Sequence, residues 1–285
     1  MDRIKIVLMA MVFALTGVSA GFSAEDPSSI VGQLNWTKGP NKASIGPMAE
    51  ITLKSGYVAI DGNDTRRLLE SMQNLTSGEE LALVGTEDLD YFAVYAFDEI
   101  GYVKDDEKSS IDADAILAQI KKNNAEANEE KKKKGWQTMD VVGWAIPPQY
   151  NSQTHNLEWA VKFRADNGQD VVNYNTKYLG RRGVMRVILV CDPAKLEPTI
   201  NEFQNVMADF RFTEGNSYSE FTQGDKVAKY GLSALIVGGA AAAAAKSGLF
   251  KYLGKFIFAA GIAVLAFAKS IFGKITSLFR RKPSN

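Results

Sequence analysis

The run 173–182 is the part of this chain where side chains able to recognise a ligand are most concentrated. It holds five candidate binding residues, Asn173, Tyr174, Asn175, Arg181 and Arg182. On a β-strand Asn173 and Asn175 share one face, while Tyr174 lies on the other. Two side-chain amides beside a guanidinium could recognise a carboxylate, a phosphate or a sugar. In the alternative that we favour, these groups form a polar network that satisfies backbone groups at the end of the strand.

Catalysis would need other residues. His155 is the only histidine of the 285-residue chain, so any histidine-based reaction must use it. The acidic run that starts at Asp105 could supply carboxylates for acid–base chemistry or for a hard cation such as calcium. Its spacing fits no calcium loop, and no serine or cysteine around His155 has the pattern of a nucleophile elbow. We therefore expect a loop histidine and a solvated acidic loop, and predict no catalytic residue, metal ion or cofactor.

Antiparallel strands must position these groups. Apolar and polar residues alternate from Leu157 to Arg164, which indicates a strand with one buried face. Asn167-Gly168 is typical of a tight hairpin turn, after which residues 171–176 form the return strand. The run 184–191 is apolar on both faces apart from Arg186, as in a central strand. It ends at the single cysteine, which excludes an intramolecular disulfide and is interpreted as a buried hydrophobe. We expect three or four consecutive antiparallel strands between 144 and 191.

The rest of the chain supplies helices and shorter strands. Helical spacing of apolar residues predicts a short helix at 65–74, a long one from about 110 to Gly135, and a third after Asp192-Pro193. Further strands are expected at 51–53, 58–60, 81–85, 91–103 and 210–212. The predicted fold class is α+β, with an antiparallel sheet and flanking helices in an extracytoplasmic domain at 46–225.

Both ends of the chain point to export and a membrane. Residues 1–20 have the basic start, short apolar run and small residues of a secretory signal peptide, although a retained anchor is the alternative. Residues 21–45 are rich in turn formers, and we expect an irregular lead segment. Residues 226–285 contain ten Lys or Arg and no acid, together with Gly/Ala-rich apolar runs. This last segment is predicted to be a cationic membrane anchor.

The anchor has two possible topologies. The apolar runs 231–245 and 256–268 are both shorter than the ~20 residues of a membrane span. One span from about 255 to 274 would leave the basic C-terminus in the cytoplasm, as the positive-inside rule prefers. A two-helix hairpin would leave it outside. We favour one span.

Charge also bears on the partners. Residues 21–225 carry 21 Lys or Arg against 32 Asp or Glu, a formal charge of −11. An acidic domain argues against a nucleic-acid partner. A cationic apolar tail instead favours the lipid bilayer as a partner, through its anionic headgroups.

Several motifs occur together in a fixed order. They are Gly101-Tyr102-Val103-Lys104-Asp105-Asp106, Gly143-Trp144-Ala145 with Pro147-Pro148, Leu157-Glu158-Trp159-Ala160, Asn173-Tyr174-Asn175-Thr176, and Leu179-Gly180-Arg181 with Gly183-Val184-Met185. With them the chain resembles the bacterial domain of unknown function 2167 family. The resemblance implies a membrane-anchored envelope protein and supplies no activity. Asn151 departs from it, because an acid is expected there.

Three hypotheses about function follow. The first is a membrane-anchored periplasmic protein of the bacterial inner membrane that acts as a non-enzymatic interaction module for an envelope protein partner. The second is an envelope hydrolase that uses His155 or the acidic residues near Asp105. The third is a structural membrane protein whose Gly/Ala-rich tail assembles in the bilayer.

Overall fold

Two antiparallel sheets form the framework of the computed structural model, which describes residues 30–72, 74, 76–133, 135, 137–229 and 231–237. The large sheet has eight strands, here in spatial order: β1 (Thr37–Lys38), β4 (Tyr57–Asp61), β5 (Glu80–Thr86), β6 (Tyr91–Asp98), β10 (Val184–Cys191), β9 (Asp170–Leu179), β8 (Asn156–Ala165) and β7 (Met139–Asn151). The small sheet has the order β11 (Phe210–Phe212), β3 (Ala49–Leu53) and β2 (Asn41–Ile45).

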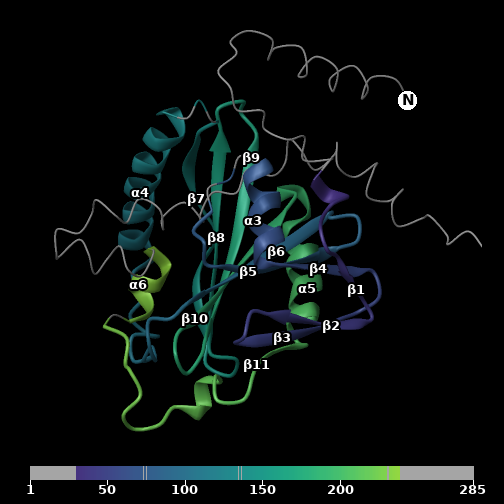
Figure 1. Ribbon diagram of the computed structural model, residues 1–285. Helices are drawn as coiled ribbons and strands as arrows, with labels where there is room; N and C mark the ends of the chain where they lie inside the picture. Colours follow the sequence, from purple (N-terminus) through teal and green to yellow (C-terminus); the bar gives the residue numbers. More distant parts are fainter. Residues whose placement is uncertain are drawn as a thin grey trace, which may run out of the picture.

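Helices cover both faces of the large sheet (Figure 1). They are α3 (Gly62–Ser71), α4 (Ala113–Lys133), α5 (Leu196–Met207) and α6 (Leu232–Val237), with short 3-10 turns η2 (Pro193–Lys195) and η3 (Tyr218–Glu220). The face that holds Met185, Val187 and Leu189 of β10 packs on α5 and the small sheet. On the other face one core lies under α3 and a second lies under α4 and α6.

The local patterns in the sequence predict most of these elements correctly. The α+β class with a large antiparallel sheet is confirmed, and β7 to β10 are the consecutive strands expected between 144 and 191. Gly168 has a φ of +81° in the hairpin between β8 and β9. The side chain of Asp61 caps α3 by accepting from the backbone N–H of Asp64 at 2.9 Å.

The ends of the domain differ from the expected boundaries of 46 and 225. The lead segment expected to be irregular at 21–45 ends in two strands, β1 and β2, because Ala43 and Ile45 bury their side chains in the core beside α5. Strand β6 ends at Asp98 rather than near 103. At the other end, Leu232, Leu235 and Ile236 of α6 are buried against the core under α4. The start of the predicted anchor thus belongs to the folded domain.

Other expectations about the ends lie outside the described residues. The predicted signal peptide at 1–20 and the apolar runs beyond Val237 fall there. Within the described ranges, no helix combines the length and the hydrophobicity that a membrane crossing requires.

The turn between β9 and β10 requires a glycine at position 183. A Cβ at this position would overlap the carbonyl oxygen of Asp98 on the neighbouring strand. We expect Gly183→Ala to lower the free energy of unfolding by about 1–3 kcal/mol, because the backbone must shift to relieve the overlap. Gly143→Ala is the matched control, since a Cβ on Gly143 in β7 meets no atom within 4 Å. Equal losses in the two variants, measured by urea unfolding, would contradict this account.

Candidate ligand-binding site

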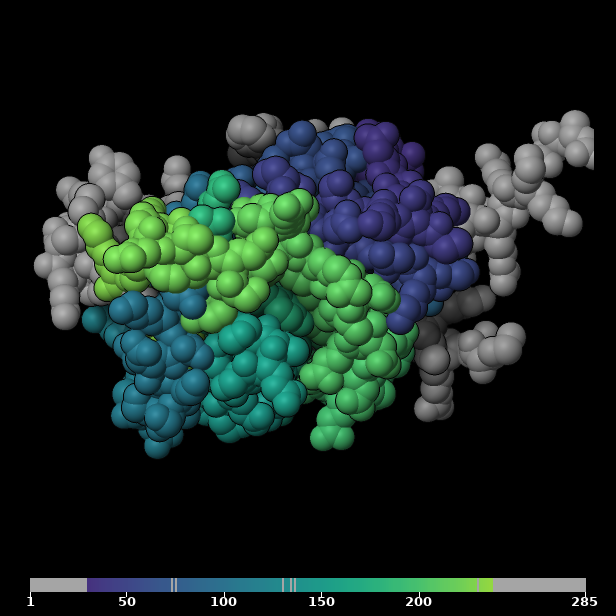
Figure 2. Space-filling view, turned by 90° about the horizontal axis from the view of Figure 1, so that it is seen from below, coloured from purple at the N-terminus to yellow at the C-terminus, as the bar shows by residue number. Residues whose placement is uncertain are grey.

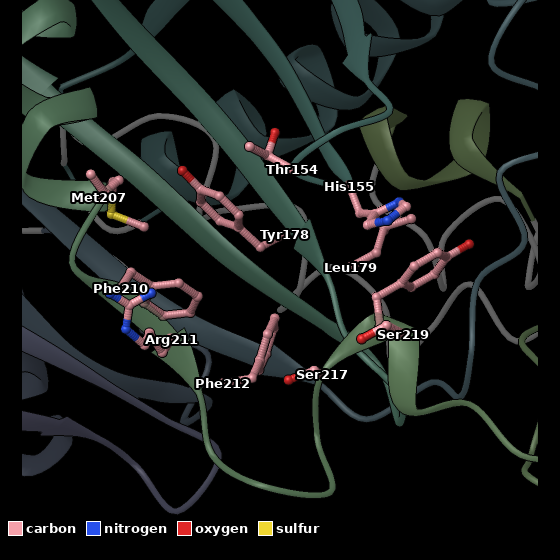
Figure 3. A pocket seen from close by; sticks show the side chains of 12 residues that line it. Thr154, His155, Tyr178, Leu179, Met207, Phe210, Arg211, Phe212, Ser217 and Ser219 are labelled. Atoms are coloured by element: carbon pink, nitrogen blue, oxygen red, sulfur yellow. The ribbon is translucent and has the colours of Figure 1, made fainter.

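A cavity of about 320 Å³ lies at the end of the large sheet where β9 stops. Its twelve lining residues are Thr154, His155, Tyr178, Leu179, Met207, Ala208, Phe210, Arg211, Phe212, Ser217, Tyr218 and Ser219 (Figure 3). They come from the turn between β7 and β8, the end of β9, the C-terminal end of α5, β11 and η3. The volume lies at the lower end of the roughly 300–1,000 Å³ that is usual for small-molecule sites.

One wall of the cavity is aromatic. The ring of Phe210 lies 5.3 Å from the ring of Tyr178 and 5.4 Å from that of Phe212. Met207 adds a thioether beside them, in contact with the hydroxyl of Tyr95 at 3.1 Å. Tilted and edge-to-face aromatic rings and a flexible thioether form an adaptable apolar surface. This wall suits an apolar or aromatic group.

The opposite wall contains His155 (Figure 3). Its ring is 4.4 Å from the ring of Tyr218. The residue has a φ of +49°, in the left-handed region, within the turn that joins β7 to β8. Arg211, Ser217 and Ser219 also line the cavity and supply hydrogen-bonding groups. The lining of the cavity is therefore mostly apolar, with a few polar groups among the aromatic and aliphatic side chains.

A short hydrogen-bonded chain connects His155 with the acidic loop. Tyr150 Oη donates to Asp105 Oδ2 at 3.2 Å and lies 3.4 Å from His155 Nδ1. The tyrosine hydroxyl therefore lies between the carboxylate of Asp105 and the ring of His155. Burial, and then the charge of Asp105, raise the pKa of Tyr150 well above its usual value, so this residue stays protonated. Tyr150 thus connects His155 with Asp105, the two residues named in the hydrolase hypothesis.

The connection from β11 to α6, residues 213–231, closes this end of the domain. In Figure 2 its light-green atoms cross the end of the molecule. Tyr102 stacks on Tyr218 and Phe221 of this segment, with ring centroids 4.5 and 4.1 Å apart. Tyr218 Oη donates to the carbonyl oxygen of Val103 at 3.0 Å. Tyr218 is thus held in place beside the cavity.

Arg181 fastens the same segment. Its Nε donates to Asp225 Oδ2 at 2.7 Å, and its Nη2 donates to Asp225 Oδ1 at 3.0 Å and to Thr222 Oγ1 at 2.8 Å. The hydrogen bond from Arg181 is the largest of the causes that hold the pKa of Asp225 far below its usual value. A bidentate contact of this kind fixes geometry. Arg181 therefore joins the end of β9 to the segment 213–231 through side-chain contacts.

The other candidate binding residues lie apart. Asn173 and Asn175 share the sheet face opposite α5, and Asn175 Nδ2 donates to the backbone oxygen of Asn173 at 3.0 Å. Tyr174 lies on the α5 face, where its hydroxyl donates to Glu158. Arg182 is exposed in the turn, and its carbonyl oxygen accepts from Gly101 N at 2.8 Å. The five residues do not line one pocket.

Comparison with known proteins gives a family. The family described as "Protein of unknown function (DUF2167)" matches residues 37–269, which is most of the chain. The chain belongs to the DUF2167 family. No curated protein matches it. Among solved structures, the chain is similar to cyanobacterial PsbP (CyanoP) from Synechocystis sp. PCC 6803, with 11% identity and a TM-score of 0.34 over 70% of this chain and 99% of that one.

In this member of the DUF2167 family, several motifs noted in the sequence meet near the cavity. Residues 101–106 supply Tyr102 and Asp105, the Pro-Pro motif leads into Tyr150, and Leu179 lines the cavity. Sequence reasoning missed the aromatic wall, because Met207 and Phe210 belong to a helical stripe that core packing explains. Tyr218 lies in a turn-rich segment, where no sequence pattern marked it as a site residue. The alternation of Phe210, Arg211 and Phe212 was the one local signal available.

Proposed function

We propose that this protein is a non-enzymatic, membrane-tethered binding domain that faces the periplasm and holds an apolar group of an envelope protein partner in the cavity beside His155. The single observation that carries the proposal is the cavity itself, which combines an aromatic wall with a few hydrogen-bonding groups. Apolar pockets with a few convergent polar groups are typical of binding sites. An apolar anchor that fills such a pocket supplies much of the affinity of a protein–protein interface.

The chemistry of the site favours binding over catalysis. Within the described ranges, His155 makes its side-chain hydrogen bond to Tyr150, and no hydrogen bond joins it to a serine or cysteine. Ser217 begins η3, where its backbone N–H donates to Glu220 Oε2 at 2.7 Å. Burial raises the pKa of the Cys191 thiol to about 11, so it is not an activated nucleophile. An activated nucleophile is what acyl transfer would require.

The second candidate remains the envelope hydrolase. It is favoured by the chain from Asp105 through Tyr150 to His155, which resembles a base held by an orienting group. A phenotype lost in His155→Ala, with the fold intact and the partner still bound, would support this candidate.

The tether and the compartment rest on the sequence. A leader at 1–20 would direct export, and the basic apolar residues beyond 237 would anchor the domain with its cationic end in the cytoplasm. The acidic domain would then project from the inner membrane into the periplasm.

A tryptophan that blocks the cavity tests the proposal. Ala208 lines the cavity at the end of α5 and is exposed, so we expect Ala208→Trp to place a large ring against the cavity without disturbing the core. Asn201→Trp is the matched control, two turns earlier on the same helix and also exposed. We expect cross-linked co-purification from mild detergent to recover the envelope partner with the wild type and with Asn201→Trp, and about tenfold less with Ala208→Trp. Equal recovery from all three would contradict a role of the cavity.

A further inference from the structure

A second group of charged side chains lies on the sheet face that carries α3, α4 and α6, away from the cavity. Lys177 of β9 and Arg186 of β10 are direct partners in the strand register. Their side chains are only 9% and 12% exposed. The next pair on this face, Val184 of β10 and Leu179 of β9, belongs to the apolar core under α4 and α6. Two cations thus occupy adjacent, largely buried positions on this face.

One carboxylate faces this pair of cations. Asp98 of β6 places Oδ1 3.0 Å from Arg186 Nε and Oδ2 3.9 Å from Lys177 Nζ. Neither contact is a hydrogen bond, because the Nε–H bond does not point at Oδ1 and the lysine distance is too long. Within the described part of the chain, Arg186 Nε and Nη2 are buried without a hydrogen-bond partner. The three side chains together carry a formal charge of +1.

In the described part of the chain, the surrounding groups give Arg186 Nε and Nη2 no acceptor. In the row of paired residues that crosses the sheet, Ala96 and Leu157 flank Arg186 and Lys177. Beyond Ala96, the carboxylate of Glu80 accepts from Ser77 N at 2.8 Å and from Gly78 N at 2.9 Å. Burial, and to a smaller extent Arg186, lower the pKa of Lys177 to about 8, although Asp98 opposes the shift. Buried donors without acceptors destabilise a fold, and their presence points to a bound ion or water.

We propose that Lys177, Arg186 and Asp98 form a binding site for an anionic oxygen group, with a carboxylate as the class that balances the charge of +1. A carboxylate can accept from Arg186 Nη2 through one oxygen and from Lys177 Nζ through the other. The planar guanidinium suits such bidentate recognition. Asp98 is the most exposed side chain of the three, at 25%.

The site is a different one from the cavity beside His155. Lys177 and Tyr178 are neighbours in β9, so their side chains point to opposite faces of the sheet. Tyr178 lines the cavity, and Lys177 faces the helices α3, α4 and α6. A ligand at one site leaves the other open, and tests of the two sites are independent.

Thermal unfolding of the intact protein in mild detergent tests this proposal. At pH 7, chloride is replaced stepwise by acetate in one series and by inorganic phosphate in another, at constant ionic strength. We expect the unfolding midpoint of the wild type to rise by several degrees in acetate and to saturate, as it does when a ligand binds the folded state. A rise in phosphate alone would assign the site to phosphate-bearing ligands. No rise above chloride in either series would overturn the proposal.

Variants locate the effect. Arg186→Leu and Lys177→Met should abolish the rise, because each removes a donor and a charge. Arg164→Leu is the control, since Arg164 is a surface cation that pairs with Asp170 at 2.8 Å and is 55% exposed. An equal rise in Arg186→Leu would place the anion elsewhere and contradict the site. If Arg186→Leu does not fold, Arg186→Lys keeps the charge without the planar fork, and we expect about tenfold weaker binding.

Discussion

Replacing Phe203 by alanine is expected to lower the free energy of unfolding by about 3–5 kcal/mol, the usual loss for a phenylalanine deleted from a core. Phe203 is 2% exposed and lies on α5, between this helix and the large sheet. Its ring meets that of Tyr174 edge to face at 6.3 Å. Because α5 leads directly to Met207, the substitution should also disturb the aromatic wall of the cavity. Urea unfolding followed by far-UV circular dichroism measures the change.

Phe203→Leu serves as the control for this prediction. It keeps most of the apolar volume, and we expect a loss below about 1.5 kcal/mol. A loss of less than 1 kcal/mol in Phe203→Ala would show that α5 does not hold the sheet as described.

Replacing Asp98 by alanine is expected to have the second large effect, near the lower end of about 3–5 kcal/mol. The substitution leaves Lys177 and Arg186 buried side by side with no carboxylate opposite them. The repulsion between these two cations and their desolvation then destabilise the folded state, while the unfolded state is unaffected. Denaturant unfolding at pH 7 and low salt measures the loss, and added acetate should restore part of it if the anion site exists.

A triple variant separates charge from packing. Asp98→Ala combined with Lys177→Met and Arg186→Leu replaces the charged group by apolar side chains of similar length. Such replacements of buried charges are often neutral or stabilising. We therefore expect the triple variant to regain most of the stability that Asp98→Ala loses. A triple variant as unstable as the single one would contradict an electrostatic origin.

Local patterns allowed much of the fold to be predicted from the sequence. The alternation in 157–164 and the Asn167-Gly168 turn each act within a few residues of chain, and the structure has the element expected at each place. Boundaries set by distant contacts were not predictable in this way. Strand β2 forms in a turn-rich segment because Ile45 buries its side chain in the core. At the other end, α6 belongs to the domain because Leu232 and Leu235 are buried in the core under α4.

The candidate site depends on distant contacts even more. His155, Tyr178, Phe212 and Tyr218 come from four separate elements, so no spacing in the sequence marks the cavity. Asn175 and Arg181 were predicted to belong to one binding site because they are close in the sequence. In the structure Arg181 binds Asp225, and the cations beside the asparagine face are Lys177 and Arg186. The pairing of β9 with β10 places the guanidinium of Arg186, and not that of Arg181, on the face that carries the asparagines.

The most direct test of the proposed function is photo-cross-linking in intact cells from a single position at the cavity. Ser219 is exposed and lines the cavity, so a photoreactive phenylalanine analogue introduced there would contact whatever occupies it. The same analogue at Asn201, exposed on α5 outside the cavity, is the control. We predict that position 219 yields one dominant cross-link to an envelope protein and that position 201 does not. No product from position 219, or the same products from both positions, would contradict the binding role of the cavity.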